Sequence, residues 1–144
     1  MLLSEGGQCF LSYGERVKAP VRIEYDARAQ GKDVGDMSAF WLSDPSSYAS
    51  GYLFGIGSNG GAANKVLIEG GGDITSSRAV PVAGKWHHVI AQVLPTGRAQ
   101  IIVDGQLSLD HQGPLLTDKA YFPGLWAWGA VSAFDNARVF TAGD

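Results

Sequence analysis

The stretch "GRAQIIVDGQLSLD", residues 97–110, decides the fold class. Apolar residues occupy every second position from 99 to 103, so they share one face of an extended strand. Asp104-Gly105 follows, and this pair is preferred in two-residue hairpin turns because both central positions need a positive φ. Apolar alternation resumes from Leu107. The stretch therefore predicts two antiparallel strands joined by a tight turn.

The same period of two recurs along the chain. In "APVRIEYDARAQ", residues 19–30, charged residues from Arg22 to Arg28 alternate with apolar ones. No segment of ten residues free of Gly and Pro carries a helical apolar stripe, and the links are rich in turn-forming residues. The pattern predicts an all-β antiparallel sandwich of the jelly-roll type, formed as one domain by residues 1–144. Further strands are expected at Gln8–Tyr13, Met37–Leu42, Tyr52–Gly57, Lys65–Glu69, Trp86–Leu94, Leu125–Trp128 and Ser132–Phe140.

Composition excludes several classes of partner. The net charge is −3 and no cationic cluster is present, so a nucleic-acid partner is not expected. No apolar run approaches the roughly 18 residues that a membrane-spanning helix needs. The one cysteine, Cys9, cannot form an internal disulfide, and its apolar neighbours predict a small buried residue.

A glycine pattern, G-x-G-x-x-G, runs from Gly55 to Gly60. A dinucleotide site built on this pattern needs a helix directly after it, because the helix N-terminus holds the pyrophosphate. Here a short strand-like run follows instead, so the glycines predict a hairpin. The polar residues Ser58, Asn59 and Asn64 either stabilise that turn or bind a ligand.

Two segments carry a family resemblance. "GKWHHVIAQVLPTGRAQIIVDGQLSLD", residues 84–110, has Gly-x-Trp-His-x-Val followed later by Val-Asp-Gly. With "GAVSAFDNARVF", residues 129–140, it resembles the central and closing strands of laminin-G-like, concanavalin A-like lectin and glucanase sandwich domains. The segment 34–67 is similar to a subgroup that includes 3-keto-disaccharide hydrolase-like domains. The resemblance implies two antiparallel sheets, one of them concave, with a glycan on the concave face or its rim loops, and Trp86 in the core.

The resemblance favours a non-catalytic carbohydrate-binding module, extracellular or periplasmic. A sugar site combines flat aromatic rings with hydrogen-bonding groups. Trp126 and Trp128 alternate and share one face, which is either the core or a sugar platform. The expected ligand contacts are Trp41, Tyr52, Asn59, Asn64 and Lys65, with Arg22 and Arg28 as a second set.

Two other functions stay open. A small glycoside hydrolase or lyase similar to the 3-keto-disaccharide hydrolases needs two carboxyl groups, and Glu24 and Asp26 lie about 6.5–7 Å apart along one strand. The flanking arginines equally suit a solvent-exposed charged face. The third function is a protein-binding adhesion module, which predicts an exposed apolar patch.

Histidine and carboxylate positions argue against a metal cofactor. His87 and His88 are adjacent, so they point to opposite faces of a strand, His87 inward and His88 outward. No cofactor is expected. Calcium is the alternative, held by Asp33 and Asp36 in glycine-rich loops, where such residues also cap turns.

Overall fold

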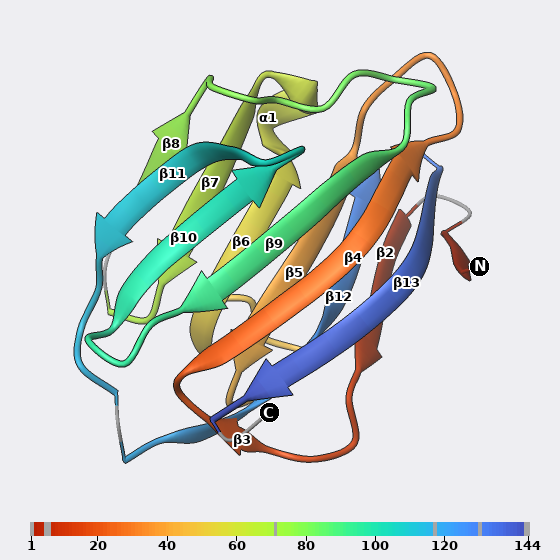
Figure 1. The fold of residues 1–144 in the computed structure, drawn as a ribbon. Helices are drawn as coiled ribbons and strands as arrows, with labels where there is room; N and C mark the ends of the chain where they lie inside the picture. Colours follow the sequence, from red (N-terminus) through yellow and green to blue (C-terminus); the bar gives the residue numbers. More distant parts are fainter. Residues whose placement is uncertain (1, 5–6, 71, 117, 130, 143–144) are drawn as a thin grey trace.

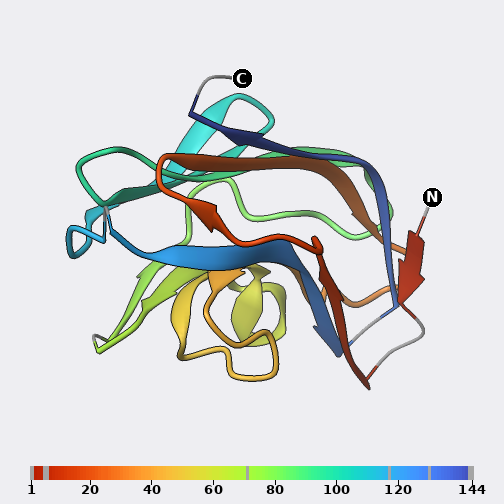
Figure 2. The ribbon, with the colours of Figure 1, turned by 90° about the horizontal axis from the view of Figure 1, so that it is seen from below.

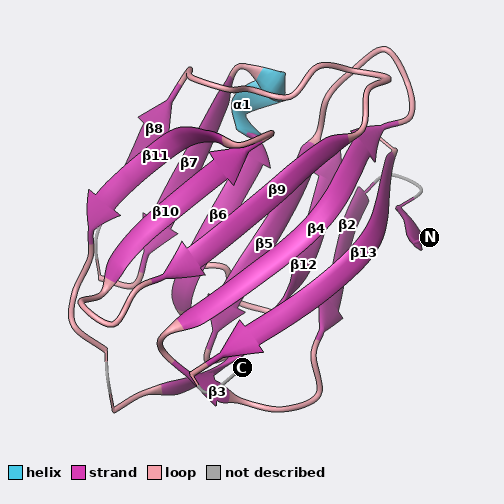
Figure 3. Ribbon diagram, viewed as in Figure 1, coloured by secondary structure: helices cyan, strands magenta, loops and turns pink. Residues whose placement is uncertain are grey.

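The computed structural model describes residues 2–4, 7–70, 72–116, 118–129 and 131–142. Almost all regular structure in this part of the chain is strand, with one short helical turn, α1 (Ser58–Gly61) (Figure 3). The strands form two stacked antiparallel sheets, which we call the front sheet and the back sheet from their places in Figure 1. The predicted antiparallel β-sandwich is confirmed.

The front sheet continues the hairpin identified in the sequence. Asp104 and Gly105 both have positive φ, 50° and 78°, as the predicted turn requires. In spatial order its strands are β1 (Leu2–Ser4), β13 (Ser132–Thr141), β4 (Val21–Ala29), β9 (His87–Val93), β10 (Arg98–Val103) and β11 (Gln106–Gln112).

The back sheet contains the glycine-rich hairpin. Its strands β6 (Gly51–Gly57) and β7 (Ala63–Ile68) pair antiparallel on either side of α1, so the hairpin interpretation of the glycine pattern is confirmed. Gly57 has φ 75°, and a Cβ there would lie 2.6 Å from Val34 Cγ1, so only glycine fits. In spatial order the strands are β2 (Gly7–Ser12), β12 (Ala120–Gly129), β5 (Asp36–Leu42), β6 (Gly51–Gly57), β7 (Ala63–Ile68) and β8 (Asp73–Ser76), with the short β3 (Val17–Lys18) also paired to β12.

The main core lies between the sheets. Every second residue of β4, from Val21 to Ala29, is buried there, as its alternation predicted. Two buried tyrosine hydroxyls donate hydrogen bonds to backbone carbonyls. The Tyr25 hydroxyl donates to Met37 O at 2.7 Å, and the Tyr52 hydroxyl donates to Gly97 O at 2.9 Å. The core therefore includes aromatic rings without leaving these hydroxyls unpaired.

The back sheet also buries apolar side chains on its outer face. Phe40, Leu42, Leu53 and Trp126 form a second cluster there, with Phe10, Leu67 and Phe122 packed around it. The connection between β5 and β6 lies below this sheet in Figure 2, on its outer side. The outer face is therefore not a plain solvent-exposed surface, and this is where the candidate site lies.

Three local expectations were wrong. β12 begins at Ala120, earlier than the strand expected at Leu125–Trp128. Cys9 is exposed because it lies on the edge strand β2, although its register partner Ala127 is buried in the core. Trp86 is 38% exposed and lies just before β9, where the Arg28 guanidinium carbon is 5.8 Å from its ring centroid, so it is not a core residue.

Candidate functional site

An aromatic row lies on the outer face of the back sheet. Trp126 and Trp128 point outward from β12, and their ring centroids are 6.3 Å apart with an interplanar angle of 26°. Tyr48, from the β5–β6 connection, also stacks with Trp126, and their ring centroids are 6.3 Å apart. Trp128 is 56% exposed, whereas Trp126 is only 5% exposed. Of the two sequence alternatives for these tryptophans, the core between the sheets is therefore excluded.

Trp126 carries an unpaired donor. Its indole Nε1 is buried and has no hydrogen-bond partner within the described part of the chain. A buried donor without a partner costs about 1–3 kcal/mol. An acceptor on a ligand that reached this atom would remove that cost.

The aromatic row forms one wall of a groove of about 500 Å³. The groove crosses the sheet from β2 to β8, and polar or charged side chains alternate with apolar ones along it. Its lining residues are Gln8, Asp36, Tyr48, Leu53, Lys65, Leu67, Asp73, Trp126 and Trp128.

Strand register places three groove residues in one line. Trp128 of β12 is paired with Gln8 of β2 on one side and with Asp36 of β5 on the other. Directly paired residues of antiparallel strands point to the same face, with Cβ atoms about 4.5–5.5 Å apart. An aromatic platform is thus flanked by an amide and a carboxyl group, which suits a ring-shaped ligand that carries hydroxyl groups.

A second hollow of about 530 Å³ opens between the two sheets near β2 and β13. Its lining combines aliphatic residues such as Leu11 and Ile23 with the polar side chains of Tyr13, Glu15 and Arg138. It offers no pair of stacked rings, so the groove over the back sheet is the better site for a polar ring.

Most of the ligand contacts expected from the sequence lie elsewhere. Trp41 and Tyr52 are fully buried between the sheets, where Trp41 Nε1 donates to Val17 O at 2.9 Å, so neither side chain can meet a surface ligand. Asn59 is exposed in the α1 turn. Lys65 is the one expected contact that lines the groove. The sequence of β5 does not show which face Trp41 occupies, because its neighbours Phe40 and Leu42 are apolar too.

Asn64 links the two sheets. It is fully buried; its Oδ1 accepts from Gly57 N at 3.1 Å, and its Nδ2 donates to Ser108 Oγ at 2.8 Å and to Ala79 O at 3.1 Å. Ser108 points inward because a bulge near Ile101 and Ile102 shifts the register of β10 and β11. The amide is therefore structural and is not accessible to a ligand.

We expect Asn64→Ala to lower the free energy of unfolding by about 2–3 kcal/mol, because it leaves buried donors and acceptors unpaired. Urea denaturation would measure the change. Asn59→Gly, at an exposed position with φ 54°, is the control and should leave stability nearly unchanged. Equal stability of the Asn64 variant and the native protein would contradict the structural role.

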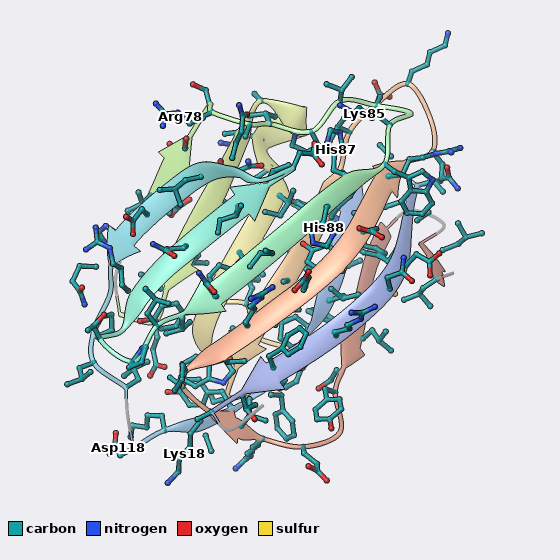
Figure 4. The ribbon with its side chains drawn as sticks, in the orientation of Figure 1. Lys18, Arg78, Lys85, His87, His88 and Asp118 are labelled. Carbon is teal, nitrogen blue, oxygen red and sulfur yellow. The ribbon has the colours of Figure 1, made fainter. Side chains whose placement is uncertain are left out.

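The charged face predicted for β4 lies on the outside of the front sheet. His88 Nδ1 is 2.7 Å from Asp26 Oδ1, and His88 Nε2 is 2.8 Å from Glu24 Oε1 (Figure 4). Arg22 donates to Glu24, and Asn136 donates to Asp26 at 2.8 Å. His88 points outward and His87 is buried, with Nδ1 2.7 Å from Asp104 Oδ2, as predicted.

The charges in this network hold both carboxyls in the ionised form. Partial burial opposes ionisation of Glu24, but hydrogen bonds from Arg22 and His88 outweigh it and lower the Glu24 pKa. Burial is likewise outweighed at Asp26, whose pKa is lowered by Asn136 and His88. A glycosidase of this type needs one carboxyl group that stays protonated as general acid, and this pair does not provide one. Arg22 and Arg28 lie on this same strand, on the sheet opposite the groove.

This network predicts that the stability of the folded protein depends on pH. The hydrogen bond to Asp26 raises the His88 pKa above its ordinary value of 6.5, so the contribution of His88 to stability is present below pH 6.5 and is lost as pH rises through the folded-state pKa. The carboxyl contributions are present above their ordinary values of 4.5 and 3.8 and are lost as pH falls. We expect Asp26→Asn to lower the His88 pKa in an NMR titration and to destabilise most at about pH 5–6.

Asp110→Asn is the matched control for that titration. Asp110 pairs with Arg98 on the same sheet, and no histidine takes part in the pair. Its substitution should leave the His88 pKa unchanged. An Asp26→Asn variant with the native His88 pKa would contradict the proposed network.

Neither calcium candidate belongs to a metal cluster. Asp33 is exposed and Asp36 lines the groove. Among the residues that the structure describes, no three His, Cys, Asp or Glu side chains are arranged to hold a metal ion. The same described ranges contain no helix long and apolar enough to cross a membrane.

Solved structures share the fold, although no protein-family model and no curated protein matches the chain. A carbohydrate-binding module, CBM66 from Bacillus subtilis, has a TM-score of 0.74 and 18% identity, over 96% of this chain and 84% of that one. Sheep galectin-11 in complex with glycerol has a TM-score of 0.59 and 11% identity, over 95% and 98%. A candidate glycosyl hydrolase from Parabacteroides distasonis has a TM-score of 0.60 and 11% identity, over 97% and 90%. The chain therefore has the concanavalin A-like, galectin-type sandwich fold.

Proposed function

We propose that this chain is a non-catalytic carbohydrate-binding module that holds a glycan in the groove over the back sheet. The observation that carries the proposal is the row of Tyr48, Trp126 and Trp128 along a groove with polar sides. Sugar rings present apolar C–H faces that stack on aromatic rings, and their hydroxyls need hydrogen-bond partners. The row offers the rings, and Gln8, Asp36 and Lys65 offer the partners.

The fold supports the carbohydrate part of this proposal. The solved structures that share it include a protein named as a carbohydrate-binding module and a galectin, but also a candidate glycosyl hydrolase, so the fold supports a carbohydrate partner without separating binding from catalysis. Fold alone does not determine function, so the proposal rests on the residues of the groove. Exposed, contiguous aromatic surface with a polar rim is typical of binding sites in proteins.

The geometry favours binding over catalysis. Glu24 and Asp26 face away from the groove, on the other sheet, and both are held ionised by cationic or amide partners. Within the groove the two carboxyl groups are Asp36 and Asp73, and Asp73 lies 3.9 Å from Lys65 Nζ.

A glycan array followed by calorimetry tests the proposal. The native protein is screened for binding, and the best glycan is then titrated into the protein at about 0.15 M salt, where long-range charge effects are screened. Saturable binding without release of reducing sugar supports a non-catalytic module. Turnover of the glycan, or binding of no carbohydrate on the array, would overturn it.

A further inference from the structure

The groove carries an excess of negative charge. Its acidic and basic lining side chains are Asp36, Lys65 and Asp73. Lys65 Nζ lies 3.9 Å from Asp73 Oδ2, so these two charges balance one another. Asp36 then leaves the groove with one uncompensated negative charge at neutral pH.

Asp36 is a half-buried carboxylate without a cationic partner in direct contact. Its Oδ1 accepts a hydrogen bond from Ser58 Oγ at 2.6 Å, and Ser58 is itself buried. No Lys, Arg or His nitrogen among the described residues forms an ion pair with it. Burial raises the Asp36 pKa, while Ser58 and the charge of Lys65 oppose that rise. A carboxylate in this setting gains most from a cation that a ligand brings to it.

The position of Asp36 fixes where that cation would lie. Asp36 is the direct register partner of Trp128, so its carboxyl stands beside the exposed aromatic platform. A sugar ring stacked on Trp128 therefore places one of its substituents next to Asp36. On the opposite side, Gln8 offers an uncharged amide.

We propose that the groove selects glycans built from amino sugars with a free ammonium group, and that Asp36 binds this group. The inference rests on the proposed function, because it concerns the same groove. An ammonium pairs with the Asp36 carboxylate, whereas an N-acetyl group leaves it without a counter-charge. The carboxylate of a uronic acid is repelled by the same residue.

Calorimetry with three defined oligosaccharides tests the inference: a glucosamine hexamer, an N-acetylglucosamine hexamer and a galacturonic acid trimer. We expect the glucosamine hexamer to bind about tenfold more tightly than its acetylated counterpart, which corresponds to one charge-assisted hydrogen bond. We expect no measurable binding of the trimer. Asp36→Asn should remove the preference for the amine, so that the two hexamers bind with equal affinity.

Asp33→Asn is the matched control, since it removes the same charge from an exposed position three residues away. It should keep the preference for the amine. An equal loss in both variants would overturn direct contact with Asp36, because general attraction between opposite charges would then explain the result. Equal affinity for the two hexamers would overturn the inference.

The inference and the proposed function can fail separately. If an uncharged or acidic glycan from the array binds best and its binding depends on Trp128, the proposed function stands and the amino-sugar inference is overturned. If no glycan of any kind binds, both are overturned.

Discussion

Trp128→Ala should abolish or severely weaken glycan binding while leaving the fold intact. Trp128 is 56% exposed, and its ring stacks on Trp126 at the outer surface of the back sheet. Its removal therefore opens no cavity in the core. Exposed tryptophans at the centre of binding sites contribute about 2 kcal/mol or more, which corresponds to at least about a 30-fold loss of affinity. Calorimetry measures the affinity, and circular dichroism with a urea titration checks the fold.

Trp86→Ala provides the matched control for this experiment. Trp86 is also a partly exposed tryptophan, but it packs against Arg28 at the start of β9 and does not line the groove. Its removal should leave affinity within a factor of about two, as expected for a position without ligand contact. If Trp86→Ala lost binding and Trp128→Ala kept it, the site would lie on another surface.

Trp41→Ala should have the largest effect on stability. Trp41 is fully buried, its ring lies 4.8 Å from the Tyr121 ring and 5.7 Å from the Tyr52 ring, and its indole N–H donates to Val17 O. Truncating a buried tryptophan to alanine costs about 3–5 kcal/mol, because the cavity is only partly filled by relaxation. Since small domains are stable by about 5–15 kcal/mol, the variant should unfold at a much lower urea concentration.

Trp41→Phe separates the two parts of this effect. Phenylalanine keeps most of the apolar contact and removes the N–H, so it should cost less than alanine. A Trp41→Ala variant with native stability and lost glycan affinity would instead support Trp41 as a ligand contact. That result would contradict its position in the core.

The strand pattern was predictable because it depends on local alternation and turn chemistry. The β10–β11 hairpin follows from Asp104-Gly105, and β4 follows from its strict alternation. The bulge that turns Ser108 inward was not predictable, because the buried Ser108 hydroxyl accepts a hydrogen bond from Asn64, which lies in a strand of the other sheet. Contacts of that kind depend on how the sheets stack, which period alone does not encode.

The site was only partly predictable for the same reason. Strands β5 and β6 are apolar on both faces, so alternation could not tell the core face from the outer face. Trp41 was expected at the surface and lies inside, whereas the pair of tryptophans on β12 lies outside. Lys65 was found because it belongs to a hairpin that borders the groove. Tyr48 was not among the expected contacts, because the sequence does not show that its loop lies against Trp126.

The direction of the groove has a consequence for the form of its ligand. The groove crosses the strands of the back sheet from β2 to β8, and neighbouring strands lie about 4.8 Å apart, so it extends for roughly 24 Å. Both β2 and β8 stand at the edges of this sheet in the order described. A channel of that length with an edge at each end can take the middle of a polymer, with the chain continuing past the protein on both sides. We therefore expect the proposed module to bind along the body of a polysaccharide rather than at its terminus.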